Sequence, residues 1–258
     1  MTTSSHPVCL ITGSATGIGA ACARTFAKHG WDVGICAFDD ETHIAAEAVE
    51  ADCRAAGART LVLRLDVTRD ESCVAAAEQM TAHFGQLDAL VNCAGTTRFI
   101  PHADLDALSA SEFTRTYDVN LIGTFQMIRA CRDALKASGR GAVVNLSSIA
   151  GTAGLGSSVA YAASKGAVST LTLSLSRALA PHIRVNAIAP GYVEGGLPSR
   201  VLAAEKLASV EAHYLKTQAL PRFLQVNEVA DLAYFLTALA PGITGEIIRM
   251  DNGLHLYA

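Results

Sequence analysis

The sequence predicts an α/β fold in which a doubly wound parallel sheet of about seven strands carries helices on both faces. Two observations predict it. Along the 258 residues, short apolar runs alternate with longer segments of helical period, which is typical of parallel strands joined by crossover helices. No stretch has the composition of an interdomain linker, and no short-period repeat is present. We therefore expect a single domain over residues 1–258.

The apolar runs give the strands in chain order: "VCLIT" (8–12), "VGICA" (33–37), "TLVLRLDV" (60–67), "LDALVNCAG" (87–95), "GAVVNLSS" (141–148), "IRVNAIAP" (183–190) and "GEIIRM" (245–250). Helices are predicted from about Gly17, through "ETHIAAEAVEADCRAAG", over Asp70–Phe84, up to Ala137, and through "SSVAYAASKGAVSTLTLSLS". In such sheets ligands bind beyond the carboxyl ends of the strands, near the point where the strand order reverses. The chemistry should therefore lie just after each strand.

Composition favours a small-molecule ligand. Of the residues, 50% are hydrophobic and 17% are charged, and the formal net charge is -4, so we expect neither nucleic acid nor membrane as a partner. The seven cysteines are odd in number and show no C-x-x-C spacing, which indicates reduced thiols and a cytoplasmic protein. The first residues lack the pattern of a signal peptide. The eight histidines show no ligand spacing, so we expect no catalytic metal.

A glycine-rich turn, "TGSATGIG", follows the first predicted strand. Glycine there permits a tight turn, lets the backbone approach a pyrophosphate, and leaves the N-terminus of the next helix facing the phosphate charge. A simple tight connection between strand and helix is the alternative. The position after the first strand favours nucleotide binding.

The spacing of these glycines, G-x-x-x-G-x-G, resembles the short-chain dehydrogenase/reductase family, which has a Rossmann fold. Further matching motifs follow in order over the whole chain: "LDV", "NCAG", "DVN", "NLSS", "YAASK" and "PGYV". The resemblance implies a nicotinamide cofactor, with Asp66 at the adenine ring. The cofactor-binding residues that it implies are Gly13, Ser14, Thr16, Gly17, Ile18, Gly19, Asp39, Asp66, Val67, Asn92, Ala94, Gly95, Tyr161, Lys165, Pro190, Gly191 and Val193.

Tyr161 and Lys165 are the candidate acid–base pair. Residues four apart lie on one helix face, and a nearby ammonium lowers the pKa of a tyrosine, whose unperturbed value of about 10 makes it a poor base. Lys165 is the only charged residue between Arg140 and Arg177. A packing tyrosine beside a lysine that extends to water is the alternative. Because the other family motifs match in order around this pair, the catalytic role is favoured.

The resemblance adds two more catalytic residues. Ser148 would hydrogen-bond the substrate oxygen as negative charge develops there, while Ser147 would be its structural neighbour. Asn120 would hold a water that links Lys165 to bulk solvent. A satisfied buried amide is the alternative for Asn120.

The turn "CAFDDE" bears on the choice of cofactor. Acidic side chains here accept hydrogen bonds from ribose hydroxyls and repel a 2′-phosphate, and Thr16 stands where phosphate-binding relatives often have Arg, so NAD(H) is favoured over NADP(H). The family's usual acidic position is Ala37 in this chain. Asp39 and Asp40, which come later, either reach the ribose or only head the next helix, where negative charge suits the helix dipole.

The family also suggests a substrate lid at about residues 192–220. Gly195 stands where a Thr is common, and with Gly196 it offers a hinge. Arg98, Phe99 and His102 either line the cavity mouth or are exposed loop residues.

We predict an oxidoreductase acting on a secondary alcohol or ketone. The alternatives are a 3-oxoacyl-carrier-protein reductase using NADPH and a non-catalytic nucleotide-sensing protein. The two helices around Asn120 and Tyr161 resemble surfaces through which relatives pair, so we expect a homotetramer or homodimer.

Overall fold

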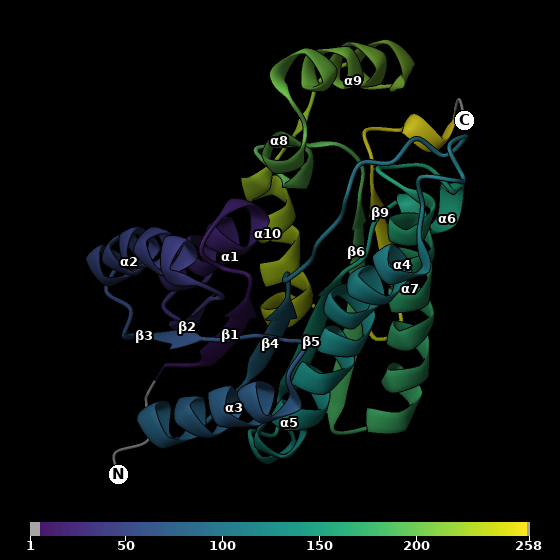
Figure 1. The fold of residues 1–258 in the computed structure, drawn as a ribbon. Coiled ribbons are helices and arrows are strands. Elements are labelled where there is room, and N and C mark those ends of the chain that lie inside the picture. Colours follow the sequence, from purple (N-terminus) through teal and green to yellow (C-terminus); the bar gives the residue numbers. More distant parts are fainter. Residues whose placement is uncertain (1–5, 257–258) are drawn as a thin grey trace.

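The computed structural model describes residues 6–256. Its main sheet holds seven parallel strands in the order β3-β2-β1-β4-β5-β6-β9 (Figure 1). The strands are β1 Val8–Thr12, β2 Asp32–Ala37, β3 Thr60–Arg64, β4 Ala89–Asn92, β5 Gly141–Leu146, β6 Ile183–Pro190 and β9 Ile247–Met250. The predicted α/β class with a doubly wound parallel sheet is confirmed.

Helices cover both faces of this sheet (Figure 1). One face carries α1 Gly17–Lys28, α2 Asp40–Ala55 and α10 Val226–Tyr234, and the other carries α3 Asp70–Phe84, α5 Gly123–Ala137 and α7 Val159–Leu179. Strand β1 shows how the sequence builds both layers. Cys9 and Ile11 pack on the first side, and Val8 and Leu10 pack on the second, because successive side chains of a strand point to opposite faces. A strand buried on both faces must therefore be apolar throughout, as "VCLI" is.

The long helical region predicted to end at Ala137 consists of three pieces. Helix α4 Ala110–Tyr117 runs through a π-helical turn, Asp118–Ile122, into α5. Such turns occur often at functional sites, and this one carries the buried Asn120.

Smaller elements lie beyond the carboxyl ends of the strands. They are α6 Ala150–Ala153, α8 Leu197–Val201, α9 Ala204–Thr217 and the 3₁₀ turn Leu254–Leu256. A π turn, Phe235–Leu239, extends α10. A two-stranded pair of β7 Val193–Glu194 and β8 Leu224–Gln225 joins the two ends of the predicted lid. The sequence did not predict this pair, since two-residue strands are too short to show a period.

The strand order reverses between β1 and β4, which are neighbours in the sheet although β2 and β3 intervene in the chain. Their carboxyl ends, Thr12 and Asn92, face each other in register. The glycine-rich turn after β1 therefore lies at the position where ligands bind in such sheets.

Candidate active site

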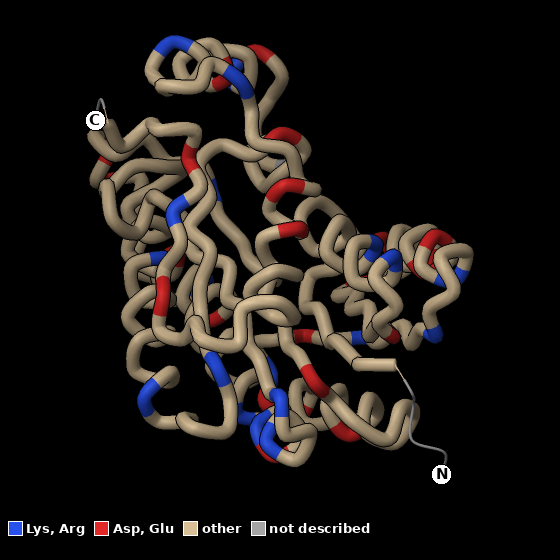
Figure 2. Tube along the Cα trace, turned by 180° about the vertical axis from the view of Figure 1, so that it is seen from behind, with Lys and Arg blue, Asp and Glu red and all other residues tan. Residues whose placement is uncertain are grey.

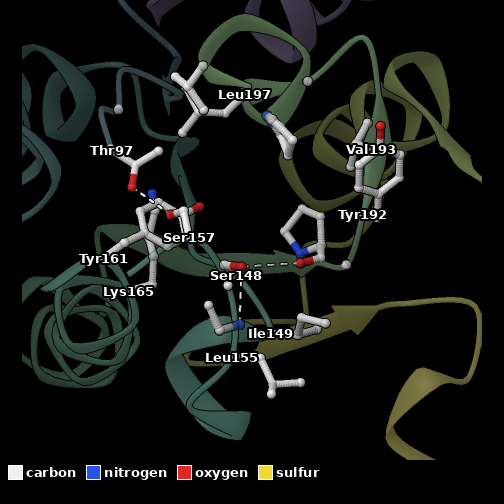
Figure 3. A pocket seen from close by; sticks show the side chains of 18 of the residues that line it. Thr97, Ser148, Ile149, Leu155, Ser157, Tyr161, Lys165, Tyr192, Val193 and Leu197 are labelled. Carbon is white, nitrogen blue, oxygen red and sulfur yellow. Dashed lines mark hydrogen bonds between the residues drawn. The ribbon is translucent and has the colours of Figure 1, made fainter. Parts of the chain in front are cut away.

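A cavity of about 550 Å³ opens at the carboxyl ends of the strands. It is lined by the glycine-rich turn, by the segments after β4, β5 and β6, by α7, and by α8 and α9 of the lid. Figure 3 shows Tyr192 and Val193 across the cavity from Tyr161 and Lys165, with Ser148 between them. Eleven predicted residues line it: Gly13, Thr16, Gly17, Ile18, Gly95, Ser148, Tyr161, Lys165, Pro190, Gly191 and Val193.

The glycine-rich turn has the geometry that a diphosphate requires. Gly13 and Gly17 have φ angles of 62° and 55°, in the left-handed region that favours glycine. A Cβ on Gly19 would lie 2.3 Å from the carbonyl oxygen of Gly13, so α1 packs directly on the turn. The first turn of α1 holds no acidic residue, and Thr16 gives it no side-chain cap. The first N–H groups of α1 are thus left for an anion.

Thr12 holds the turn after β4, and the sequence analysis missed it. The Thr12 hydroxyl oxygen accepts hydrogen bonds from the backbone N–H groups of Cys93 and Ala94, each at 3.0 Å. A Cβ on Gly13 would lie 2.9 Å from Cα of Ala94, so the two loops are in contact. A threonine ending an apolar strand directly before the glycine turn was the available signal.

Two predicted residues act inside the protein. The Ser14 hydroxyl is fully buried, donates to the carbonyl of Ile11, and accepts the N–H of Cys36 at 2.7 Å. The Ser14 side chain therefore ties β1 to β2, and cofactor binding by Ser14 stays a prediction. The Ser147 hydroxyl donates to the carbonyl of Lys165 at 2.9 Å, so it is the structural neighbour that we expected.

Ser148, Tyr161 and Lys165 meet at the base of the cavity. The Ser148 hydroxyl accepts the N–H of Ala150 at 3.1 Å and has the carbonyl of Pro190 at 3.4 Å. The Ser158 hydroxyl caps α7 at the N–H of Tyr161, which fixes where the helix begins. This local structure turns the phenol of Tyr161 toward Ser148.

The expected effect of Lys165 on Tyr161 is wrong for this structure. Burial raises the pKa of Tyr161 to about 12, and a hydrogen bond with Ser148 counteracts the rise only in part. Lys165 is not among the groups that lower it: its ammonium lies 5.7 Å from the centroid of the Tyr161 ring and donates to the carbonyl of Leu146 at 2.6 Å. Burial lowers the pKa of Lys165 to about 8. Tyr161 is therefore an acid that holds its proton at neutral pH.

Asn120 is buried and hydrogen-bonded within the protein. Its Oδ1 accepts the N–H of Thr96 at 2.8 Å, and its Nδ2 donates to the Thr96 carbonyl and to the Ser164 hydroxyl, each at 3.0 Å. A Cβ on Gly95 would lie 3.4 Å from Asn120 Oδ1 and 3.7 Å from Lys165 Nζ. Asn120 and Lys165 thus converge on the space that this glycine leaves open.

The residues predicted for the adenosine end lie outside this cavity. Asp39 caps α2: its Oδ1 accepts the N–H of Thr42 at 2.8 Å, and the Thr42 hydrogen bonds lower the pKa of Asp39. Asp66 Oδ1 accepts two hydrogen bonds from Thr68, and Val67 is buried against Gly123. From the sequence, Asp39 either reaches the ribose or only heads the next helix. In the structure, Asp39 caps α2.

Asn92 and Ala94 hold neighbouring strands and loops together next to the cavity. Asn92 Nδ2 donates to Asn145 Oδ1 at 2.9 Å, and its own buried Oδ1 has no partner among the described residues. The pair links β4 to β5 below the site. Ala94 contributes its backbone N–H to Thr12, as described above.

The lid is attached to the body of the protein at two points. The buried Tyr192 donates its hydroxyl proton to Glu211 Oε1 at 2.6 Å, and its ring lies 5.2 Å from that of Tyr214. Near the mouth, Lys206 Nζ lies 5.2 Å from the centroid of the Phe99 ring. Gly195 has a φ of 71°, a conformation that the family's usual Thr would rarely adopt.

Other residues that line the cavity could not be identified clearly from the sequence. Phe99 lines the cavity, as considered, while Arg98 pairs with Glu112 at 3.4 Å and His102 is not among the lining residues. Cys93 and Leu254 also line it. Leu254 arrives there because β9 pairs with β6, a contact that spacing along the chain does not reveal.

Neither a metal site nor a membrane span is found among residues 6–256. No three His, Cys, Asp or Glu side chains in this range are grouped so that they could hold a metal ion. None of the helices in this range is long and apolar enough to cross a membrane.

Comparison with known proteins gives consistent matches. A family model described as enoyl-(acyl carrier protein) reductase matches residues 13–255. The chain is 36% identical over 252 residues to ketoacyl reductase 2, so assigned, of the granaticin polyketide synthase of Streptomyces violaceoruber, covering 97% of this chain and 96% of that protein. It is 36% identical over 252 residues to cis-4-hydroxycyclohexanecarboxylate dehydrogenase of Sinomonas cyclohexanicum, covering 95% of each. A Burkholderia xenovorans structure, assigned as a short-chain dehydrogenase/reductase, superposes with a TM-score of 0.92 at 52% identity, covering 98% of this chain and 100% of that one.

Proposed function

The chain belongs to the short-chain dehydrogenase/reductase family and is an oxidoreductase of alcohols or ketones that uses a nicotinamide cofactor, and we propose that it works with NAD(H) and with Tyr161 as its acid–base group. The observation that carries the proposal is the meeting of Ser148, Tyr161 and Lys165 at the base of a cavity whose other end is the glycine-rich turn. A ring-bearing secondary alcohol fits the name of the Sinomonas relative.

The residues present fit the cofactor. The N-terminus of α1 and the turn at Gly13 and Gly17 would hold the diphosphate, because their N–H groups and absent side chains leave room for an anion. Lys165 would hold the nicotinamide ribose. The bound cofactor supplies or accepts the hydride at the substrate carbon.

In the reductive direction, Tyr161 donates its phenolic proton to the substrate oxygen as the carbonyl carbon is reduced, and in the oxidative direction it takes that proton back. Ser148 donates a hydrogen bond to the same oxygen and so stabilises the charge that develops there. Asn120 and Lys165 face the gap at Gly95 and would return a proton to Tyr161 from that side. A Tyr161 pKa of about 12 makes the proton-donating role the easier one at neutral pH.

The preference for NAD(H) rests on charge at the carboxyl end of β2. Asp39 and Asp40 follow this strand after Phe38, and Asp39 keeps one carboxylate oxygen outside its capping bonds. Arg64 is the basic residue beside them, and it pairs with Asp40 at 3.0 Å. A 2′-phosphate would have to compete with this ion pair.

The ketoacyl reductase relative supports a second candidate, reduction of a carrier-bound 3-oxoacyl group with NADPH. Acidic carrier proteins require exposed, unpaired basic side chains near the cavity mouth. Near the mouth, Arg98 and Arg115 share the one carboxylate of Glu112, and Lys206 lies over Phe99. Acidic and basic residues are interspersed over the chain, so basic charge is not gathered into one patch (Figure 2). We therefore favour a free small molecule.

Assembly into a homotetramer or homodimer is part of the proposal. Three large apolar side chains are exposed on neighbouring elements: Ile122 on the π turn before α5, Phe125 on α5 and Leu173 on α7. A cytoplasmic location is supported by the seven cysteines, all among the described residues and joined by no disulfide.

A panel of secondary alcohols and ketones, each assayed with NAD(H) and NADP(H), tests the proposal through the absorbance of the reduced nicotinamide. We expect turnover of ring alcohols with a higher kcat/KM for NAD(H). A clear preference for NADP(H) would contradict the charge argument, and no turnover of any substrate would contradict the catalytic one.

A further inference from the structure

The part of the cavity beyond Tyr161 is lined by few ionisable side chains. Among the described side chains that line the cavity there is no Asp, Glu or Arg. Lys165 is 5% exposed, and its ammonium is engaged by the carbonyl of Leu146. His213, on the exposed side of α9, is the other lining residue with a basic group. A carboxylate or phosphate on the substrate would therefore be desolvated without a dedicated partner, which is costly.

The cations near the mouth lie outside the cavity lining. Lys206 Nζ lies over the Phe99 ring at 5.2 Å from its centroid, and Lys206 is not among the residues that line the cavity. The Arg98 guanidinium pairs with Glu112. Neither side chain lines the cavity, so neither is placed to pair with an anionic group bound inside it.

Several hydroxyl groups that line the cavity are already hydrogen-bonded within the protein. The hydroxyls of Thr97 and Ser157 lie 2.6 Å apart and hydrogen-bond each other. Both side chains are labelled in Figure 3. Tyr192 donates to Glu211. A polyhydroxylated substrate would find few open partners here and would leave its own hydroxyls unsatisfied.

The rest of the cavity lining is an apolar wall that includes aromatic rings. The rings of Tyr192 and Tyr214 lie 5.2 Å apart, and Phe223 backs Tyr192 at 5.1 Å. Leu155, Leu202 and Leu254 add aliphatic surface from the loop after α6, the lid and the C-terminal segment. Such a wall binds a ring by apolar contact and stacking.

We propose that the substrate is an uncharged, mostly apolar alicyclic or aromatic ketone or secondary alcohol, and that anionic and polyhydroxylated substrates are excluded. This inference rests on the proposed oxidoreductase function and names the substrate class of the same site. It distinguishes the chain from relatives that are named for a carboxylate-bearing ring.

A matched pair of ketones tests the proposal: 4-oxocyclohexanecarboxylate and its methyl ester, which differ in charge and little in shape. We expect kcat/KM for the ester to exceed that for the acid by about 100-fold or more, because the acid buries an unpaired charge. Equal values, or a higher value for the acid, would overturn the uncharged class while the oxidoreductase function stands.

A binding measurement separates this inference from the reaction. In saturation-transfer NMR with the full chain, the ester should give a strong signal that the acid does not displace. If no ketone is turned over but this difference holds, the proposed function fails and the binding class survives. Strong binding of the acid overturns the class.

A charge placed in the wall gives a second test. Val210→Arg on α9 puts a guanidinium at a lining position, whereas Leu215→Arg changes the same helix at a position that is not among the lining residues. The ester-to-acid ratio of kcat/KM should fall about tenfold in the first variant only. An equal ratio in both variants would contradict the placement of the substrate against this wall.

Discussion

Burial moves the pKa values of Tyr161 and Lys165 apart. Tyr161 rises to about 12 and Lys165 falls to about 8, in both cases mainly because the charged form loses water. Tyr161 therefore stays neutral at neutral pH, while Lys165 loses its charge at a lower pH than an exposed lysine does. The sequence shows their spacing, but it could not show that Lys165 turns its ammonium toward a backbone carbonyl.

Lys165 should make stability depend on pH. Its pKa in the folded protein is lowered, so between about pH 8 and the unfolded value of about 10.4 the unfolded chain binds more protons, and stability rises with pH. Below pH 8 the buried ammonium costs about 3 kcal/mol. Lys165→Met should therefore be more stable than the parent at pH 7, and the difference should shrink by pH 10.

Denaturant unfolding of both proteins at several pH values measures this difference. Burial raises the pKa of several cysteines as well, such as Cys36 and Cys131, but their contribution cancels when the two proteins are compared at the same pH. A constant stability difference from pH 7 to pH 10 would contradict a lowered pKa at Lys165.

Residue roles differed in how far the sequence could predict them. The glycines at 13, 17 and 19 were predictable because no other residue suits their turn. Thr12 and Ser14 were harder, since a hydroxyl near a strand end can face either a ligand or the backbone. Only the structure shows that both hold backbone groups.

Helix α9 is held to the rest of the protein by few contacts. None of its described side chains is buried, and its attachments are the Tyr192–Glu211 hydrogen bond, the Tyr192–Tyr214 ring contact and the Lys206–Phe99 contact. Elements with few buried contacts open at low free-energy cost. This helix is therefore suited to admit and release substrate.

Glu211→Ala should loosen the lid without unfolding the domain. Loss of the acceptor for Tyr192 removes a charge-assisted hydrogen bond, so backbone amides of Ala204–Thr217 should exchange hydrogen about tenfold faster, and KM should rise. Exchange in α7 should not change. Glu211→Gln, which keeps an acceptor oxygen, is the matched control, and equal exchange rates in Ala, Gln and parent proteins would exclude the hydrogen bond as an attachment of the lid.

Element bounds were predictable where the sequence pattern was strong. The first strand, Val8–Thr12, the sixth, Ile183–Pro190, and helix α3, Asp70–Phe84, occur as predicted. The β7–β8 pair and the π turn at Asp118–Ile122 were not predicted. Both depend on tertiary contacts, since neither is long enough to leave a period in the sequence.

At the scale of the whole molecule, the proposed assembly can be tested through one apolar side chain. Phe125 is 38% exposed on α5, near the exposed Ile122. If this face joins subunits, the parent protein should elute in light-scattering chromatography at two or four times the 26.9 kDa chain mass, and Phe125→Glu should lower that mass by placing a charge in the interface. A parent protein at monomer mass would contradict the proposal.

The overall architecture was largely predictable because strand and helix alternation leaves few topologies. Seven strands and two helical layers follow from pattern alone. The meeting of Leu254 with Tyr161 in one cavity does not, since it requires β9 to complete the sheet next to β6. The substrate side of the site is built from such distant segments, whereas the cofactor side is built from motifs that are contiguous in the chain.

The central claim is that Tyr161 transfers the proton during hydride transfer. Tyr161→Phe removes the hydroxyl and leaves the ring, Ser148 and Lys165 in place, so cofactor should still bind, as followed by the fluorescence of the reduced nicotinamide. The account predicts that kcat falls by at least about 10³-fold while the cofactor Kd is unchanged. A kcat close to that of the parent protein would contradict it.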